Sequence, residues 1–265
     1  MTIKLIALDM DDTLLDSKLA VSPRASAAIR KAAEQGIKVT IATGRMYRSA
    51  VPYAQQLGLD VPLITYNGGL IKSCFSGETL LHRPIDKDIA REVLSLCREQ
   101  NLYIQTYVDD NLYVKEQNEY SEIYSRMSRV PAIVVGDSLY AGEGYSTKML
   151  IMSSKEGIRE IYNSFKKIFG NKLSMAISKP TFMEITHPEV NKGKALAYLA
   201  DKLMIKQDEV MAVGDSGNDV DMLKYAGWGV AMGNASAAVK AIARLETASN
   251  DADGVAEAIE RYALN

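Results

Sequence analysis

The chain has 265 residues, 47% hydrophobic and 24% charged, an ordinary globular composition with apolar material for one large core or two smaller ones. The net charge of -2, without a long run of lysine and arginine, argues against nucleic acid as a partner. Two cysteines cannot form a disulfide framework, and no segment is apolar over the length of a membrane span. We therefore expect a cytoplasmic protein with no membrane partner.

The first predicted elements alternate between strand and helix. The segment 4–8, in which Lys4 is followed by four consecutive apolar residues, is typical of a strand buried on both faces of a parallel sheet. Ser22-Pro23 then begins a helix, since serine is a good N-cap and proline suits the first helical position, and Gly36 ends it. Strands at 38–42 and 61–65 and a helix at 52–57 follow. This alternation predicts βαβ units.

The middle of the chain has a different pattern. A helix at 86–100 precedes two tyrosine-rich strands at 102–114, which flank the turn Asp109-Asp110-Asn111. A strand at 147–153, a helix at 156–169 and a strand pair at 173–185 follow. The α/β pattern then returns, with strands at 209–213 and 228–231 and helices at 220–225, 235–243 and 254–262. We therefore predict a discontinuous α/β core, residues 1–83 and 188–265, with an inserted α+β domain at 84–187.

Polar residues follow three predicted core strands. Asp9 and Asp11 follow the first strand, Thr43 follows the second, and Asp215 follows the strand at 209–213. Because the ligand crevice of an open parallel sheet lies at the carboxyl ends of its strands, we expect these four side chains around one crevice.

Three clustered carboxylates are unfavourable unless a cation compensates them. No histidine lies near these strand ends, so a hard divalent cation such as Mg²⁺ fits best. The alternative for Asp9 and Asp11 alone is a pair of turn or N-cap carboxylates, but Asp215 on a second strand end favours the metal site.

Two lysines stand at the start of a predicted helix. Lys192 and Lys194 precede an amphipathic segment, although cations near a helix N-terminus oppose the helix dipole. A bound anion would satisfy the lysines together with the free backbone N–H groups. The alternative is a solvated pair of surface lysines. We expect one of the two, Lys192, to be functional.

These motifs in this order resemble the haloacid dehalogenase superfamily, and the inserted domain is similar to the α/β cap of its Cof-type branch. The matching segments are Asp9-Met-Asp11-Asp12-Thr13-Leu14, Thr43-Gly44-Arg45, Lys192-Gly193 and Gly214-Asp215-Ser216-Gly217-Asn218-Asp219. The resemblance implies a Rossmann-like core, with 84–187 as a cap for substrate selection. At position 12, within the first motif, the family often has glycine, whereas this sequence has aspartate.

The resemblance also implies roles for individual residues. Asp9 would be the nucleophile that forms an aspartyl phosphate, and Asp11 the general acid and then the base. The implied Mg²⁺ ligands are Asp9, Asp215, the backbone carbonyl of Asp11 and, through water, Ser216. The implied phosphate-binding groups are Met10, Thr43, Gly44, Lys192 and Asn218.

Three further residues match loops that line the site in this family: Arg45, Asn67 and Asp219. A structural ion pair is the alternative role for Arg45. Asp219 would orient Lys192, or it would cap the helix at 220–225. His82 and His187 flank the predicted cap and are expected to be hinge or surface residues. The tyrosines of the cap are expected to pack its sheet, with substrate contact as the alternative.

Competing functions differ in the residues that they need. A dehalogenase needs no equivalent of Asp11, and a serine hydrolase built on the near match Gly214–Asn218 to G-x-S-x-G lacks a suitably placed histidine. A phosphomutase shares Asp9, Asp11 and the metal, and the sequence does not separate it from a phosphatase. A phosphate-ligand sensor would not need both aspartates.

The favoured function is thus a Mg²⁺-dependent phosphatase acting on small phosphorylated metabolites. Sugar phosphates are the preferred class by family analogy alone, beside nucleotides and phosphorylated cofactors. No motif bears on the oligomeric state.

Overall fold

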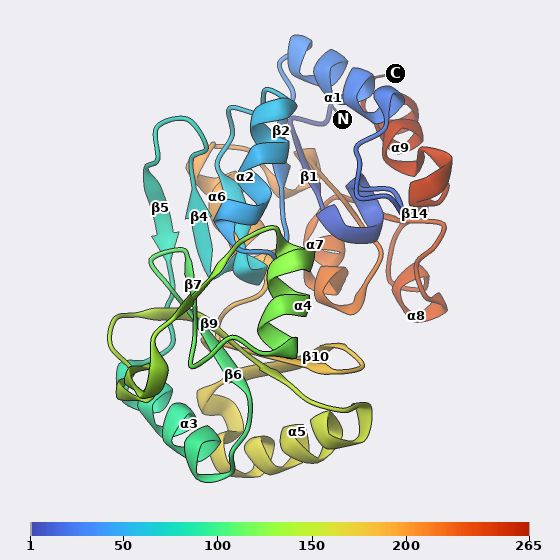
Figure 1. Ribbon diagram of the computed structural model, residues 1–265. Helices are drawn as coiled ribbons and strands as arrows, with labels where there is room; N and C mark the ends of the chain where they lie inside the picture. Colours follow the sequence, from blue (N-terminus) through green and yellow to red (C-terminus); the bar gives the residue numbers. More distant parts are fainter. Residues whose placement is uncertain (1, 265) are drawn as a thin grey trace. The chain divides into compact units, whose positions relative to one another are not determined.

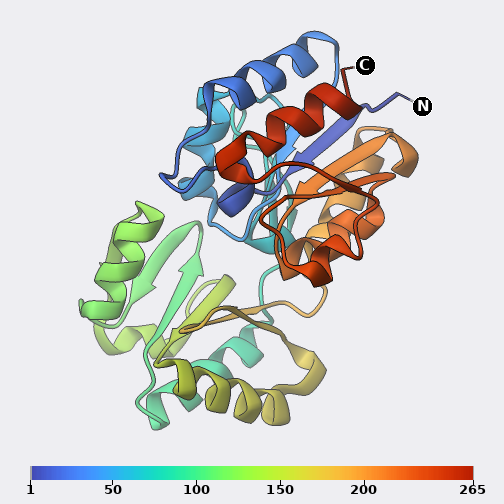
Figure 2. The same cartoon turned by 90° about the vertical axis from the view of Figure 1, so that its right-hand side faces the viewer.

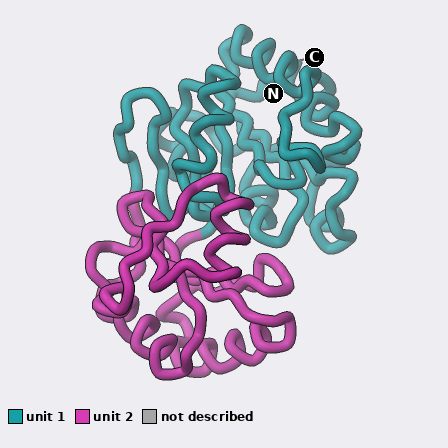
Figure 3. The backbone as a smooth tube through the Cα atoms, viewed as in Figure 1, with its two compact units in different colours: residues 1–81, 191–265 teal, residues 82–190 magenta. Residues whose placement is uncertain are grey.

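The structure is a computed structural model that describes residues 2–264. The chain forms two compact units, residues 1–81 with 191–265 and residues 82–190 (Figure 3). Within the described residues, no helix is both long and apolar enough to cross a bilayer.

The first unit is built on a parallel sheet with the strand order β14-β13-β12-β1-β2 (Figure 1). The strands are β1 (Leu5–Leu8), β2 (Lys38–Ile41), β12 (Val210–Gly214), β13 (Trp228–Ala231) and β14 (Leu245–Glu246). β1 is fully buried, with Leu5 in register with Val210 on one side and with Lys38 on the other. The predicted α/β class with a parallel sheet is confirmed.

Helices cover both faces of this sheet. α1 (Pro23–Glu34) and α9 (Gly254–Tyr262) lie side by side on one face (Figure 2). α6 (Lys192–Lys202) and α7 (Val220–Tyr225) pack on the other face, where Leu196, Leu199 and Met222 bury against Leu5 and Ala7. The apolar run of β1 therefore reflects burial from both sides, as the sequence predicts.

The start of α1 follows from its sequence. The Ser22 side chain accepts a hydrogen bond from the Ala25 N–H. Pro23 occupies the first turn, where backbone N–H groups make no hydrogen bond within the helix, so the missing N–H of proline costs none. Other boundaries differ from the prediction. α2 (Tyr47–Gln56) begins five residues before Pro52, and α8 spans only Ala237–Lys240. Pro52 is thus inside a helix rather than at its start.

The third predicted strand, β3 (Leu63–Thr65), lies at the edge of the parallel sheet. A single parallel bridge joins Ala42 to Ile64, and β3 then pairs antiparallel with β4 (Leu70–Lys72). β5 (Thr79–His82) completes this three-stranded sheet. β4 and β5 are additional to the elements predicted from the sequence.

The second unit contains a six-stranded sheet with the order β10-β11-β9-β6-β7-β8. Its strands are β6 (Ile104–Val108), β7 (Asn111–Val114), β8 (Ala132–Val134), β9 (Ser146–Met152), β10 (Ser174–Lys179) and β11 (Phe182–Thr186). The predicted hairpin of β6 and β7 is confirmed, and its turn residues Asp109 and Asp110 have φ values of 48° and 58°. β8 was not predicted.

The second unit has a hydrophobic core of its own. α3 (Lys87–Glu99) and α5 (Lys155–Phe169) bury Val93, Leu94 and Phe165 against Ile104 and Met149 of the sheet. α4 (Glu119–Ser128), which was not predicted, contributes Tyr124. Its ring contacts the rings of Tyr107 and Phe182, so Tyr107 and Tyr124 pack as expected.

Candidate active site

Asp9 lies at the carboxyl end of β1, where its backbone N–H donates to the carbonyl of Val213 at 2.9 Å. The residue is only 5% exposed. The chain then makes a wide turn, in which the N–H of Leu14 donates to the Asp9 carbonyl. Asp12, at the position where glycine was expected, adopts the left-handed backbone with φ 59°. Aspartate tolerates this conformation better than most residues, so the turn forms without glycine.

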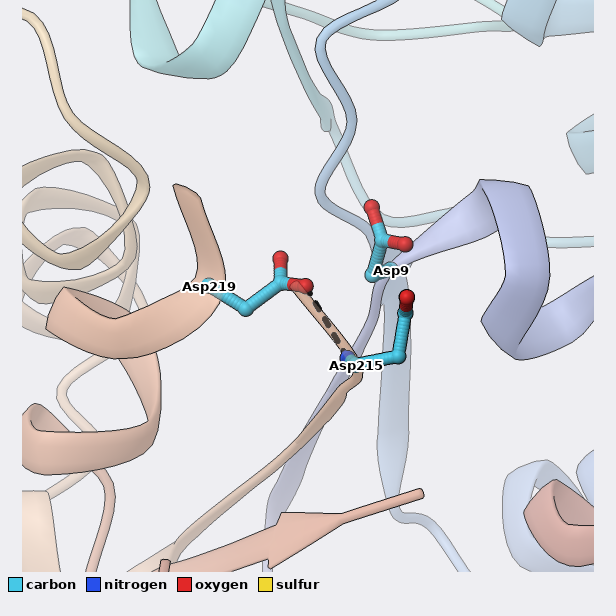
Figure 4. A group of neighbouring side chains, drawn as sticks. All are labelled: Asp9, Asp215 and Asp219. Atoms are coloured by element: carbon cyan, nitrogen blue, oxygen red, sulfur yellow. Dashed lines mark hydrogen bonds between the residues drawn. The ribbon is translucent and has the colours of Figure 1, made fainter. Parts of the chain in front are cut away.

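Three carboxyl groups meet at this point. Oxygens of Asp9, Asp215 and Asp219 all lie within 4.8 Å of one another, and Figure 4 shows the three groups turned toward a common space. The expectation that Asp9 and Asp215 lie together is therefore correct. The third member differs from the prediction, since it is Asp219 rather than Asp11.

A buried lysine joins two of these carboxylates. Lys192 is 0% exposed, and its Nζ lies 2.5 Å from Asp9 Oδ1 and 2.6 Å from Asp219 Oδ1. Lys192 is the first residue of α6, whose N-cap Asn191 accepts a hydrogen bond from the Lys194 N–H. Lys194 itself is exposed. Of the two lysines, only Lys192 thus enters the site, and a pair of surface lysines is ruled out.

Asp219 organises both Lys192 and the loop after β12. Its Oδ2 accepts hydrogen bonds from the backbone N–H groups of Asp215 at 3.0 Å and Ser216 at 2.9 Å, the first of which is drawn in Figure 4. Its side chain makes no capping hydrogen bond to α7. Of the two roles that the sequence left open, the structure therefore favours the first, since Asp219 contacts Lys192 and makes no side-chain cap to α7.

The loops after β2, β3 and β12 are tied together. The N–H of Thr43 donates to the Ile64 carbonyl, and the N–H of Asn67 donates to the Thr43 carbonyl. The Asn218 side-chain amide donates to Asn67 Oδ1 at 2.9 Å. A Cβ atom at Gly44 would lie 2.9 Å from the same oxygen, so a larger residue there would require the Asn67 side chain to shift.

Ser216 and Met10 are placed beside these loops. The Ser216 hydroxyl donates to Asn218 Oδ1 at 2.6 Å, while the side chain of Met10 is fully buried, which leaves only its backbone for ligands. All the residues predicted for the site thus lie in the first unit, on the connected loops after β1, β2, β3 and β12 and at the start of α6.

Asp11 is oriented differently from the prediction. Its carboxylate accepts hydrogen bonds from Arg45 Nε at 2.9 Å and from Arg45 Nη2 at 2.5 Å. Both oxygens are therefore held by one guanidinium, and Asp11 is not a member of the carboxylate cluster. The structural ion pair considered for Arg45 exists, and Asp11 is its partner.

Thr13 lies in the first motif, but the motif alone predicts no role for its side chain. Its hydroxyl donates to Asp215 Oδ1 at 2.9 Å, which fixes the orientation of that carboxylate. The signal was its position in the turn after Asp9, because a hydroxyl there lies at the same edge of the sheet as the loop after β12.

The charges of the site do not balance. Burial raises the pKa of Asp9 well above its usual value, and the neighbouring Asp219 adds to this effect while Lys192 opposes it. Burial also raises the pKa of Asp215 to about 6, against the hydrogen bond from Thr13. Burial would lower the pKa of Lys192, but the charges of Asp219 and Asp9 outweigh it and raise this pKa. Three carboxyl groups share one lysine here, so the site has fewer positive than negative groups.

The donor atoms present fit a divalent cation. Within residues 2–264, Asp9 Oδ2 and Asp215 Oδ2 accept no hydrogen bond, so both oxygens are available as ligands. Asp219 is already engaged by Lys192 and two backbone amides. Two carboxylates with room for water and substrate oxygens are the kind of site that Mg²⁺ takes.

Comparison with known proteins agrees with this arrangement. The sequence pattern of the haloacid dehalogenase-like hydrolases matches residues 6–259. The chain belongs to this family. A crystal structure of a haloacid dehalogenase-like hydrolase from Bacteroides thetaiotaomicron superposes with a TM-score of 0.91 at 30% identity, covering 98% of this chain and 99% of the other.

Two relatives of this haloacid dehalogenase-like hydrolase illustrate the phosphatase names that are frequent among the similar proteins. The 5-amino-6-(5-phospho-D-ribitylamino)uracil phosphatase YcsE of Bacillus subtilis is 33% identical, with 99% of this chain and 96% of the relative covered. The phosphatase YwpJ of Bacillus subtilis is 32% identical, with 96% and 97% covered. The chain is therefore an enzyme of the phosphoric monoester hydrolase class, as predicted.

Proposed function

We propose that the enzyme is a Mg²⁺-dependent phosphatase that hydrolyses small phosphorylated metabolites through an aspartyl phosphate on Asp9. The observation that carries this proposal is the Asp9 carboxylate itself, which is buried at the end of β1, bound to Lys192 and adjacent to Asp215. A buried carboxylate that keeps one oxygen free of hydrogen bonds is suited to act as a nucleophile.

In the first half of the reaction, Asp9 attacks the phosphorus atom in line with the leaving oxygen. The new bond joins Asp9 to phosphorus, the bond from phosphorus to the leaving oxygen breaks, and Asp11 supplies a proton to that oxygen. In the second half, Asp11 takes a proton from water, which attacks the phosphorus atom and releases inorganic phosphate and the free Asp9 carboxylate.

Positive charge and hydrogen-bond donors would hold the transferred group. We assign its oxygens to Lys192, Thr43, Asn218 and the backbone N–H groups after Asp9 and Thr43, those of Met10 and Gly44. Phosphoryl transfer depends mainly on positioning and on charge stabilisation, and the loops that carry these groups are cross-linked by hydrogen bonds.

We assign the Mg²⁺ site to Asp9, Asp215 and the backbone carbonyl of Asp11, with Ser216 acting through water. The bound cation would neutralise the repulsion between the Asp9 carboxylate and the phosphate anion. The arrangement supports this assignment, because three carboxyl groups meet around one buried lysine, Lys192, and a bound cation would supply the missing positive charge.

For the substrate, we propose a phosphorylated sugar or polyol, selected by contacts from the inserted unit at 82–190. The names of the relatives support this class, because YcsE and a second Bacillus subtilis relative, YitU at 29% identity, are named for a substrate with a phosphorylated ribityl group. The inserted unit lies between the second and third motifs and has its own core, so its surface can vary while the chemistry stays the same.

The proposal is tested by phosphate release from a panel of phosphorylated metabolites in Mg²⁺, with Asp9→Asn beside the wild type. We expect a clear ranking by kcat/KM with sugar and polyol phosphates first, and at least about a thousandfold loss in Asp9→Asn with an unchanged fold. Isomerised sugar phosphate without free phosphate would instead identify a mutase, and full turnover by Asp9→Asn would refute the nucleophile.

A further inference from the structure

Asp11 is held by Arg45 in an ion pair that uses both oxygens of the carboxylate. Arg45 Nε and Nη2 donate to separate Asp11 oxygens, at 2.9 and 2.5 Å. Such a two-point contact fixes the orientation as well as the position of the carboxylate. Asp11 lies in the loop after β1 and Arg45 in the loop after β2, so the pair joins two neighbouring loops of the site.

Arg45 is the better anchored partner of the two. Its backbone N–H donates to the Thr43 hydroxyl, and its backbone carbonyl accepts from the N–H of Tyr66. Its guanidinium carbon lies 5.8 Å from the centre of the Tyr53 ring. The Arg45 side chain is 12% exposed, whereas that of Asp11 is 48% exposed. Arg45 is therefore the fixed element, and Asp11 is the partner that solvent reaches.

This geometry constrains the acid–base chemistry of Asp11. An acid must present an O–H group to the leaving oxygen, but each Asp11 oxygen now accepts a hydrogen bond from Arg45. Each carboxyl oxygen has a second lone pair, so Asp11 can carry the proton on the side away from Arg45 while the guanidinium still orients the side chain. When Asp11 acts as a base, both contacts can be present.

We propose that Arg45 is a positioning residue for Asp11, which it keeps oriented for proton transfer to and from the reacting oxygens. This inference rests on the proposed phosphatase function, and it adds a role for a residue that does not itself exchange a proton. It predicts that the loss of rate on replacing Arg45 is larger for substrates whose leaving group needs a proton than for substrates whose leaving group departs without one.

The test compares two leaving groups in Arg45→Met. One substrate is p-nitrophenyl phosphate, whose leaving group departs without a proton, and the other is the alkyl phosphate that ranks first in the metabolite panel. Release of the alcohol is measured in a single turnover, so that breakdown of the phosphorylated enzyme does not contribute. We expect a loss of about tenfold or more with the alkyl phosphate and less than about threefold with p-nitrophenyl phosphate.

Three further variants make the result specific. In Asp11→Asn, adding Arg45→Met should cause no further loss, because the residue that Arg45 positions can no longer exchange a proton. Arg45→Lys keeps the charge but cannot contact both oxygens in the same way, so it should rescue only part of the rate. Arg48→Met, an exposed arginine on α2, should match the wild type.

The outcomes separate the inference from the function on which it rests. Equal losses on both substrates, or a further loss in the Asp11→Asn background, would overturn the role of Arg45 while the phosphatase assignment stands. Absence of turnover in the wild type would overturn the assignment itself. If Arg45→Met does not fold, Arg45→Lys is compared on the same two substrates. A larger loss with the alkyl phosphate than with p-nitrophenyl phosphate then supports the role of Arg45, and equal losses overturn it.

Discussion

At the scale of residues, the site is defined by a surplus of negative charge. Asp9, Asp215 and Asp219 face one another, and Lys192 supplies one positive charge between Asp9 and Asp219. A buried lysine with two carboxylate partners is held in one position, which suits a group that has to meet an incoming phosphate. The remaining charge is the reason for expecting a cation beside Asp215.

This charge makes a prediction for Asp215→Asn. In the absence of metal, burial raises the pKa of Asp215 to about 6, above the value of about 3.9 in an unfolded chain. The stability that comes from this raised pKa is fully present below about pH 3.9 and is lost as the pH rises through about 6. In EDTA at pH 7, Asp215→Asn should therefore unfold at a higher temperature than the wild type, and near pH 4 the two should converge.

Magnesium should reverse the order of the unfolding temperatures of the wild type and Asp215→Asn. Added Mg²⁺ should raise the unfolding temperature of the wild type at pH 7 and have little effect on Asp215→Asn, because a ligand that binds only the folded state stabilises it. Asp221→Asn, which removes an exposed carboxylate from α7, serves as the control and should respond like the wild type. An equal response of Asp215→Asn to Mg²⁺ would show that Asp215 is not a ligand.

At the scale of elements, the position of Lys192 depends on how closely α6 approaches α7. Gly193, the second residue of α6, faces the backbone of Asp221, and a Cβ atom there would lie 2.5 Å from the Asp221 carbonyl oxygen. The side chain of Met222 on α7 and that of Leu196 on α6 belong to the same core cluster. The start of α6, and with it Lys192, is thus set by a helix contact that leaves no room for a side chain.

Gly193→Ala should consequently destabilise the protein by about 1–3 kcal/mol, the usual cost of overpacking a well-filled contact. It should also lower kcat/KM, since α6 carries Lys192. Gly217→Ala is the matched control for stability, because no atom lies within 4 Å of a Cβ at that position. Urea unfolding of both variants measures the difference. A Gly193→Ala protein as stable as Gly217→Ala would show that the two helices can separate freely.

Elements with strong local signals were predictable from the sequence. The buried run of β1, the Ser22-Pro23 start of α1 and the turn between β6 and β7 each have a local cause and were found. The elements that were missed are short or depend on partners. β4 pairs antiparallel with β3, so it depends on the turn between these two strands. α4 packs Tyr124 against strands that are distant in sequence.

The grouping of the candidate residues was more predictable from the sequence than their individual contacts. Strand ends predicted the meeting of Asp9 with Asp215, because that follows from sheet topology alone. The directions of side chains do not follow from topology, so the pairing of Asp11 with Arg45 and the place of Asp219 in the carboxylate cluster appeared only in the structure. The same holds for the Thr13 hydroxyl.

At the scale of the whole molecule, the chain consists of two compact units, and the candidate site residues lie in one of them. The site residues all belong to residues 1–81 and 191–265, and the inserted unit at 82–190 has a separate core around Phe165 and Met149. Each unit buries its own apolar side chains, so local stability in one should depend little on packing in the other.

Phe165→Ala tests this division. Phe165 is 0% exposed and packs against Phe169, so its truncation should cost about 3–5 kcal/mol in the second unit. Hydrogen exchange should accelerate within 82–190 and stay near wild type in the first unit. Leu199→Ala, in the core of the first unit, should give the opposite pattern. Uniform acceleration over the whole chain in both variants would mean that the units unfold as one.

The most direct test of the account is to trap the phosphorylated enzyme. Wild-type enzyme is mixed with substrate and Mg²⁺, quenched in acid within one turnover, reduced with borohydride and analysed by peptide mass spectrometry. The account predicts that residue 9 is converted to homoserine, the reduction product of an aspartyl phosphate, and that other aspartates, including Asp11, are unchanged. Rapid release of phosphate with no modification at Asp9, or modification at another residue, would contradict it.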